Sequence, residues 1–120
     1  MRRVLAALAL VVCSVALAGC GDDEPANNGK DLPTKTIEIT FEGDSVTPNG
    51  DRVDVQAGQP IELVVKADVA GEIHVHSDPE HEFEYGSGTT TLKSFTIDKP
   101  GIVEVESHGL EKTIVQLEVK

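Results

Sequence analysis

From Thr36 to the end of the 120-residue chain, apolar and polar residues alternate along short segments. This alternation predicts β-strands with one apolar face, because successive side chains of a strand point to opposite sides. Turn sequences such as Asn49-Gly50 and Ala70-Gly71 separate the segments at the spacing of β-sandwiches, about 8–12 residues. The expected strands are centred on residues 37–41, 53–55, 61–65, 73–75, 83–85, 95–97, 103–105 and 115–119. No segment keeps a helical period. We therefore predict an all-β fold, an antiparallel Greek-key β-sandwich with one face of each sheet in water.

The first 20 residues form a separate, apolar segment. Arg2 and Arg3 precede a largely apolar run over residues 4–16. This length suits the hydrophobic region of a signal peptide and is short for a membrane-spanning helix, which needs about 20 apolar residues. The sequence therefore predicts export across the cytoplasmic membrane.

The segment Leu17-Ala18-Gly19-Cys20 follows this run and resembles the lipobox of bacterial lipoproteins. The resemblance implies that Cys20 is diacylated, with palmitate as a typical acyl chain, and becomes the mature N-terminus. Two or more acyl chains hold a small domain stably at a bilayer, whereas one chain binds only marginally. We therefore expect a protein anchored by lipid to the cell membrane on its extracytoplasmic side. The alternative is an ordinary signal peptide that is cleaved near Ala18.

Residues 21–35 connect the signal segment to the alternating region. They contain Pro25, Gly29 and Pro33 and no aromatic residue. As a random coil this stretch spans about 20 Å. The expected organisation is a signal peptide over residues 1–20, a flexible tether over 21–35 and a β-sandwich over 36–120.

The mature chain is strongly acidic. Without residues 1–20 it keeps 8 basic and all 21 acidic residues, a net charge of −13. Such a chain lacks the basic face that binds nucleic-acid phosphates, and anionic lipid repels it, so its membrane attachment has to be covalent. The charge favours cations as partners.

Both cysteines, Cys13 and Cys20, lie in the lipoprotein signal segment. The predicted β-sandwich therefore has no thiol. This excludes a disulfide, a cysteine-ligated zinc or iron–sulfur cluster and a cysteine nucleophile from that domain.

The alternating region resembles the cupredoxin family over residues 36–119. The segment Val55–Leu63 is similar to that family's strand, glycine turn and long core strand, and Ala70–His74 to the place of its first copper-ligating histidine. Lys99–Ser107 is similar to the penultimate strand, and Thr113–Val119 to the last strand. The Ile-His-Val-His sequence that ends at His76, together with the Val-Glu-Val-Glu-x-His sequence, resembles cupredoxin-like lipoproteins of actinobacteria. The resemblance implies a cupredoxin-like β-sandwich.

The copper ligands of that family are only partly present. A type 1 copper site needs a cysteine thiolate, two histidines and usually a weak methionine ligand. When the family's copper ligands are carried over by position, Ser107 stands at the cysteine position and is directly followed by His108. The methionine position falls near Leu110. The mature chain has no methionine. The resemblance therefore predicts the fold without type 1 copper and without its electron transfer.

Three of the four histidines form a candidate metal site. His74 and His76 are two positions apart on an expected strand, so both project from the same face. In the cupredoxin strand order, His108 lies on the adjacent strand near the same end. Together with Glu72 or Glu106, these imidazoles form a nitrogen and oxygen donor set for Cu(II) or Zn(II). We therefore expect an extracytoplasmic domain that holds a divalent metal or docks with an exported protein that handles one.

The same residues leave a metal-free alternative open. A His-x-His pair on a strand is commonly a solvated or hydrogen-bonded pair. In that case the domain is a β-sandwich interaction module of the cell envelope, with an exported protein as partner. His81 is expected in a loop and is the least favoured ligand.

Other chemistries have weaker support in the sequence. The acidic run Asp78, Glu80, Glu82 and Glu84 lacks the spacing of a calcium-binding loop and is expected to be a solvated strand face. No serine lies in a Gly-x-Ser-x-Gly elbow, and no catalytic triad is indicated by spacing. We therefore do not expect an enzyme.

Overall fold

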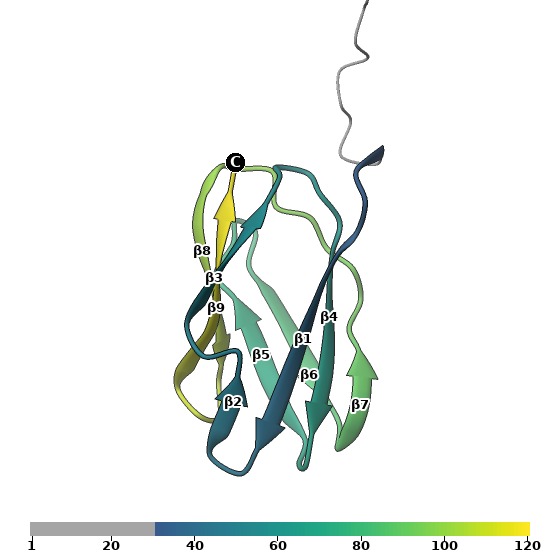
Figure 1. The fold of residues 1–120 in the computed structure, drawn as a ribbon, viewed down its shortest axis with the longest axis vertical. Helices are drawn as coiled ribbons and strands as arrows, with labels where there is room; N and C mark the ends of the chain where they lie inside the picture. The colour runs from purple at the N-terminus through teal and green to yellow at the C-terminus, as the bar shows by residue number, and fades with distance from the viewer. Residues whose placement is uncertain (1–30) are drawn as a thin grey trace, which may run out of the picture.

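The computed structural model describes residues 31–120, which form two β-sheets packed face to face (Figure 1). The strands are β1 (Lys35–Glu42), β2 (Ser45–Thr47), β3 (Asp51–Val55), β4 (Ile61–Ala67), β5 (Gly71–Val75), β6 (His81–Tyr85), β7 (Gly88–Thr91), β8 (Gly101–Ser107) and β9 (Lys112–Val119). From residue 31 onward there is no helix that would be long and apolar enough to span a bilayer. The predicted signal peptide, Cys20 and tether residues 21–30 lie outside the described residues.

The two sheets have the strand orders β2-β1-β4-β7 and β3-β9-β8-β5-β6. Most neighbouring strands are antiparallel, but β1 pairs with β4 and β3 pairs with β9 in parallel. The predicted all-β sandwich is confirmed, and its sheets are mixed rather than purely antiparallel. Alternation alone does not reveal this difference, because it fixes the buried face of a strand and not the direction of its neighbour.

The inward-facing residues of both sheets form one apolar core. In β4, Leu63 is fully buried, whereas its neighbour Val64 is partly exposed on the outer face. In β5, Ile73 and Val75 are fully buried, whereas His74 between them faces outward. The strand phase predicted from the alternation is therefore confirmed in both sheets.

Two short strands were not expected from the sequence. β2 has only three residues, and β7 is the polar sequence Gly-Thr-Thr-Thr, so neither presents an apolar face that a pattern can reveal. Conversely, the strand expected near residues 95–97 forms only an isolated bridge between Phe95 and Ile61.

The two ends of the described chain lie at the same end of the sandwich. β1 begins at Lys35, inside the predicted tether, and the side-chain amide of Gln59 donates a hydrogen bond to the carbonyl of Pro33 at 2.9 Å. Nearby, the backbone N–H of Ala57 donates to the carbonyl of Lys120 at 2.8 Å. The turn between β8 and β9 lies at the opposite end (Figure 1), so it is distal to the point where the N-terminal segment joins.

Candidate metal centre

β5 places two imidazoles side by side on the outer face of the five-stranded sheet. Because Ile73 and Val75 fill the core, His74 points outward, and His76, just past the end of β5, points the same way. The centroids of the two rings are 4.3 Å apart. The side chain of His74 is 18% exposed and that of His76 is 37% exposed, so an ion from solvent has access to both.

The turn between β5 and β6 brings a carboxylate to these two rings. Glu80 Oε2 lies 3.1 Å from His74 Nε2, and Glu80 Oε1 lies 3.7 Å from His76 Nδ1. One ligand atom from each of the three residues lies within 4.8 Å of the others. Two imidazole nitrogens and one carboxylate oxygen at such distances are a donor set that suits Zn(II) or Cu(II).

Glu80 was not expected in this site. Its place in the acidic run with Asp78, Glu82 and Glu84 predicted a solvated strand face. Glu82 and Glu84 do lie on the exposed face of β6, with Glu82 Oε1 4.0 Å from His74 Nε2, and Asp78 pairs with Lys99. Glu80 differs because it precedes β6, and the turn folds it back over β5. Its position four residues after His76 was the only signal in the sequence.

A second carboxylate fixes the orientation of His76. Glu106 on β8 lies opposite His74 in the strand register, and its Oε2 atom is 2.6 Å from His76 Nε2. Because an ionised carboxylate only accepts, the Nε2–H of His76 donates this hydrogen bond, which leaves Nδ1 directed toward Glu80. The hydrogen bond to Glu106, aided by the charges of Glu106 and Glu80, raises the pKa of His76 above 6.5.

His108 lies on the same face but has a different partner. It is the first residue after β8, which is the strand next to β5, as expected. Its ring centroid is 6.4 Å from that of His74. The two rings are stacked with an angle of 7° between their planes. The Nδ1 atom of His108 lies 3.3 Å from Glu72 Oε1. The structure thus gathers the three predicted histidines on one face and divides them between Glu80 and Glu72.

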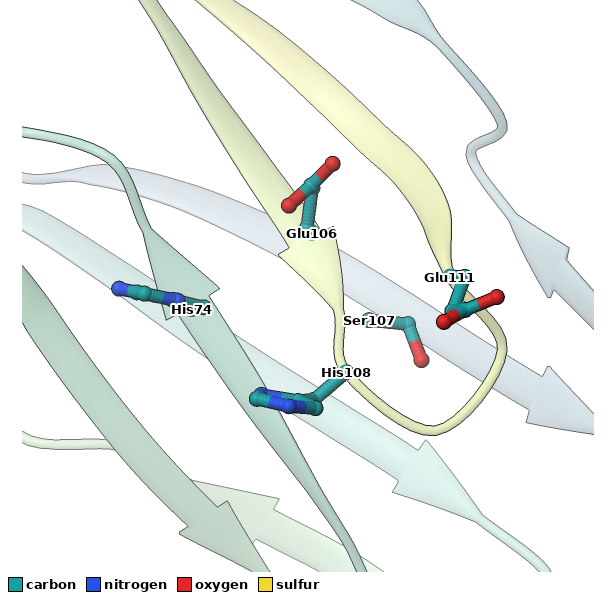
Figure 2. Close-up of a pocket in the computed structure, with 5 residues that line it drawn as sticks. All are labelled: His74, Glu106, Ser107, His108 and Glu111. Carbon is teal, nitrogen blue, oxygen red and sulfur yellow. The ribbon is translucent and has the colours of Figure 1, made fainter.

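A pocket of about 290 Å³ lies beside these rings. Its lining residues are His74, Glu106, Ser107, His108 and Glu111. In Figure 2, His74 and His108 project to one side of β8, whereas Ser107 points toward the turn that carries Glu111.

Ser107, the predicted cysteine place, has a structural role. Its side chain is on the inner face of β8, it is 1% exposed, and its Oγ atom accepts a hydrogen bond from the backbone N–H of Leu110 at 3.2 Å. Its register partner on β5 is Ile73 rather than His74. The sheet therefore separates Ser107 from the outward-facing ring of His74, and the residues at this place do not fit a type 1 copper ion.

His81 was predicted to lie in a loop, but the structure places it in a strand. It is the first residue of β6 and shares the inner phase of that strand with Phe83. Its ring centroid lies 5.9 Å from that of Phe83 and 5.1 Å from that of Phe95. The loop prediction was wrong because β6 begins two residues before Phe83, the first of its apolar residues. His81 belongs to an aromatic cluster and lies away from the outer face.

Comparison with known proteins identifies the fold only. No protein-family model and no curated protein matches the sequence. Among solved structures, the metal-binding domain of the Cu(I)-exporting P-type ATPase CopA from Streptococcus pneumoniae D39 is similar, with 17% identity, a TM-score of 0.55, and 72% of this chain and 86% of that chain covered. Auracyanin A, a blue copper protein from Chloroflexus aurantiacus, matches with 16% identity and a TM-score of 0.54 over 73% of this chain and 100% of that chain.

A variant of amicyanin in its reduced Cu(I) form matches at 8% identity with a TM-score of 0.52, over 77% of this chain and 89% of that chain. These similarities confirm the predicted cupredoxin-like β-sandwich. At such identities the ligands of those proteins do not carry over, and the chemistry has to be argued from the residues of this chain.

Proposed function

We propose that this domain binds a divalent transition metal, Zn(II) or Cu(II), through His74, His76 and Glu80. The observation that carries the proposal is the convergence of three ligand atoms from these residues within 4.8 Å on one sheet face. Borderline metal ions favour imidazole and carboxylate donors, and the net charge of −11 for the whole chain favours any dication.

The hydrogen bonds around the site define how each residue would act. The ion would take the place of the proton between His74 Nε2 and Glu80, which are 3.1 Å apart. His76 would ligate through Nδ1 while its Nε2–H remains bonded to Glu106. A carboxylate behind a ligating histidine orients the ring and makes it a better ligand.

Three protein ligands leave at least one coordination position to water or to a ligand from a partner. Residues 31–120 contain neither cysteine nor methionine, so no residue of the domain supplies the thiolate of a blue copper site. We therefore propose a role in holding or delivering the metal rather than in electron transfer or catalysis. The copper proteins that share the fold support metal handling as the general function.

Zinc titration by calorimetry tests this proposal. Full-length protein extracted in detergent is expected to bind Zn(II), and the His74→Ala and His76→Ala variants are expected to lose most of that affinity. His81→Ala is the matched control, because it removes an imidazole from the inner side of β6. Equal binding by His81→Ala and His74→Ala would refute the site, and no binding by the wild-type protein would leave the metal-free interaction module as the function.

We also propose that the domain is exported and held at the membrane by lipid on Cys20. The signal-like segment and the lipobox-like Leu-Ala-Gly-Cys sequence support this proposal. The wild-type protein should partition into the detergent phase of Triton X-114, and Cys20→Ala should remain unprocessed or lose stable membrane association. Wild-type protein that stays in the aqueous phase would contradict the lipid anchor.

A further inference from the structure

The three ligands proposed above leave one position of a tetrahedral ion unassigned. Zn(II) in proteins is commonly bound by four ligands. The further donor side chains of the outer face that lie near the rings of the site are Glu82, Glu106 and His108. The identity of the fourth ligand decides whether the ion is open to outside molecules or enclosed by the protein.

Two of these donors already have other partners. Glu106 Oε2 lies 2.6 Å from His76 Nε2 and orients that ring. His108 Nδ1 lies 3.3 Å from the carboxylate of Glu72. The ring of His108 is stacked on that of His74 with an angle of 7° between their planes, so the two rings direct their nitrogen lone pairs in nearly parallel planes. Neither residue joins the ion without giving up its present contact.

Glu82 has no such competing partner. It lies on β6 directly across from His74 in the strand register, and opposed residues of antiparallel strands have Cβ atoms about 4.5–5.5 Å apart. Its Oε1 atom is 4.0 Å from His74 Nε2, the same nitrogen that lies 3.1 Å from Glu80 Oε2. Within residues 31–120, no lysine or arginine nitrogen lies within 4.0 Å of its carboxylate. Two carboxylates therefore approach one histidine nitrogen, and that of Glu82 is free to bind an ion.

The distances around His74 suit a shared ion. Two ligand atoms of one Zn(II) ion lie at most about 4.0–4.3 Å apart, the sum of two bond lengths, and about 3.3 Å apart in a tetrahedron. The distances from His74 Nε2 to Glu80 and to Glu82, 3.1 and 4.0 Å, are within this limit. The Glu82 side chain is 65% exposed, so packing does not oppose the movement of about 0.7 Å that a tetrahedron requires.

We infer that Glu82 is the fourth ligand of this ion and takes the position that the other three ligands leave to water. The inference rests on the proposed metal site and completes it with two imidazole nitrogens and two carboxylate oxygens. Closed sites of four protein ligands hold their ion, whereas catalytic sites keep one position open. The protein therefore encloses the ion, and a recipient of the metal has to displace one of the exposed carboxylates.

Zinc titration of two matched variants tests the role of Glu82. Glu82 and Glu84 both lie on the exposed face of β6, but of these two only Glu82 lies within 4.0 Å of a histidine nitrogen. With full-length protein in detergent and Zn(II) alone as the probe, Glu82→Gln should weaken binding by at least the roughly 10–100-fold that even an outer carboxylate contributes. Glu84→Gln removes the same charge two positions along the strand and should weaken binding far less.

Co(II) in place of Zn(II) reports whether a position on the ion is open. The visible spectrum of bound Co(II) changes when azide replaces a water ligand. Azide should leave the spectra of the wild-type and Glu84→Gln complexes unchanged, because four protein ligands fill the tetrahedron. In Glu82→Gln water takes the place of the carboxylate, so azide should change the spectrum. Loss of a surface charge alone would not produce this difference.

The contrary outcomes separate this inference from the proposed metal site. Equal losses of zinc affinity in Glu82→Gln and Glu84→Gln would mean that only the charge of the face matters. That result would refute the fourth ligand, whereas a larger loss in His74→Ala would retain the site. A spectral response of the wild-type complex to azide would also refute the fourth ligand. A wild-type protein that binds no Zn(II) would refute the metal site itself.

Discussion

The outer faces of the two sheets lie in water, but their compositions differ. The outer face of the four-stranded sheet carries residues such as Glu38, Thr40, Val64 and Lys66, which line a small pocket there. The outer face of the five-stranded sheet carries three of the four histidines, which are His74, His76 and His108, each within 4.0 Å of a glutamate oxygen. A β-sandwich requires only that such faces be polar. The fold therefore does not explain these histidines, whereas the proposed metal site accounts for His74 and His76.

The largest effect expected from a single substitution concerns the core beneath these faces. Leu63→Ala should lower the free energy of unfolding by about 2–5 kcal/mol, because Leu63 is fully buried. Val64→Ala, one position along β4 on the outer face, should cost much less. Chemical denaturation measures both. Equal losses would mean that Val64 is packed as tightly as Leu63. The outer face of the four-stranded sheet would then not lie in water, and the comparison of two solvent-exposed faces would be wrong.

Zinc should stabilise the folded protein through the outer face of the five-stranded sheet and not through that of the four-stranded sheet. The expected gain in unfolding free energy is somewhat smaller than the loss in Leu63→Ala. An ion at 100 times its dissociation constant stabilises the folded state by about 2.7 kcal/mol. Thermal unfolding of the wild-type protein and of Glu38→Gln should shift upward with zinc, and that of His74→Ala should shift much less. A full zinc response in His74→Ala would locate the ion elsewhere.

The smallest expected effect concerns the contact between His76 and Glu106. The hydrogen bond from His76 to Glu106 raises the folded-state pKa of His76 above 6.5, so the stabilisation is fully present below pH 6.5 and is lost as pH rises through the raised pKa. Both side chains are 37% exposed, and solvent screening limits such a pair to about 0.2–1 kcal/mol. Without metal, Glu106→Gln should therefore be less stable than the wild type at about pH 5.5 and equal to it at about pH 8.5. A deficit that is larger at the higher pH would contradict this role of His76.

The same raised pKa affects metal binding, because a ligating imidazole has to be neutral. Zinc affinity should fall as pH decreases through the raised pKa of His76. In Glu106→Gln the decline should begin at a lower pH, and calorimetry over a pH series measures it.

The sequence predicted the parts of this molecule that depend on local pattern. The phase of β4 and β5 followed from alternation, because a buried face needs an apolar residue at every second position. That phase correctly placed His74 and His76 together outside the core. The polar strand β7 and the parallel pairing of β1 with β4 were not predicted, because neither leaves a local apolar signal.

The carboxylate partners were predicted only in part. Glu72 and Glu106 were expected near the histidines because they alternate with core residues on the same strands. Glu80 was not expected, because its contact depends on the path of the turn between β5 and β6. The separate pairing of His108 with Glu72 likewise depends on the position of the β8–β9 turn against β5. Such contacts are tertiary and leave no periodic trace in the sequence.

The most direct test is the position of a bound ion. Crystals of the protein grown with Zn(II) should give an anomalous-scattering peak on the outer face of the five-stranded sheet. This peak is expected to lie about 2.0–2.1 Å from one nitrogen of His74 and one of His76, with Glu80 as a third ligand. A peak between the sheets beside Ser107, or no peak near His74 and His76, would contradict the proposed metal site.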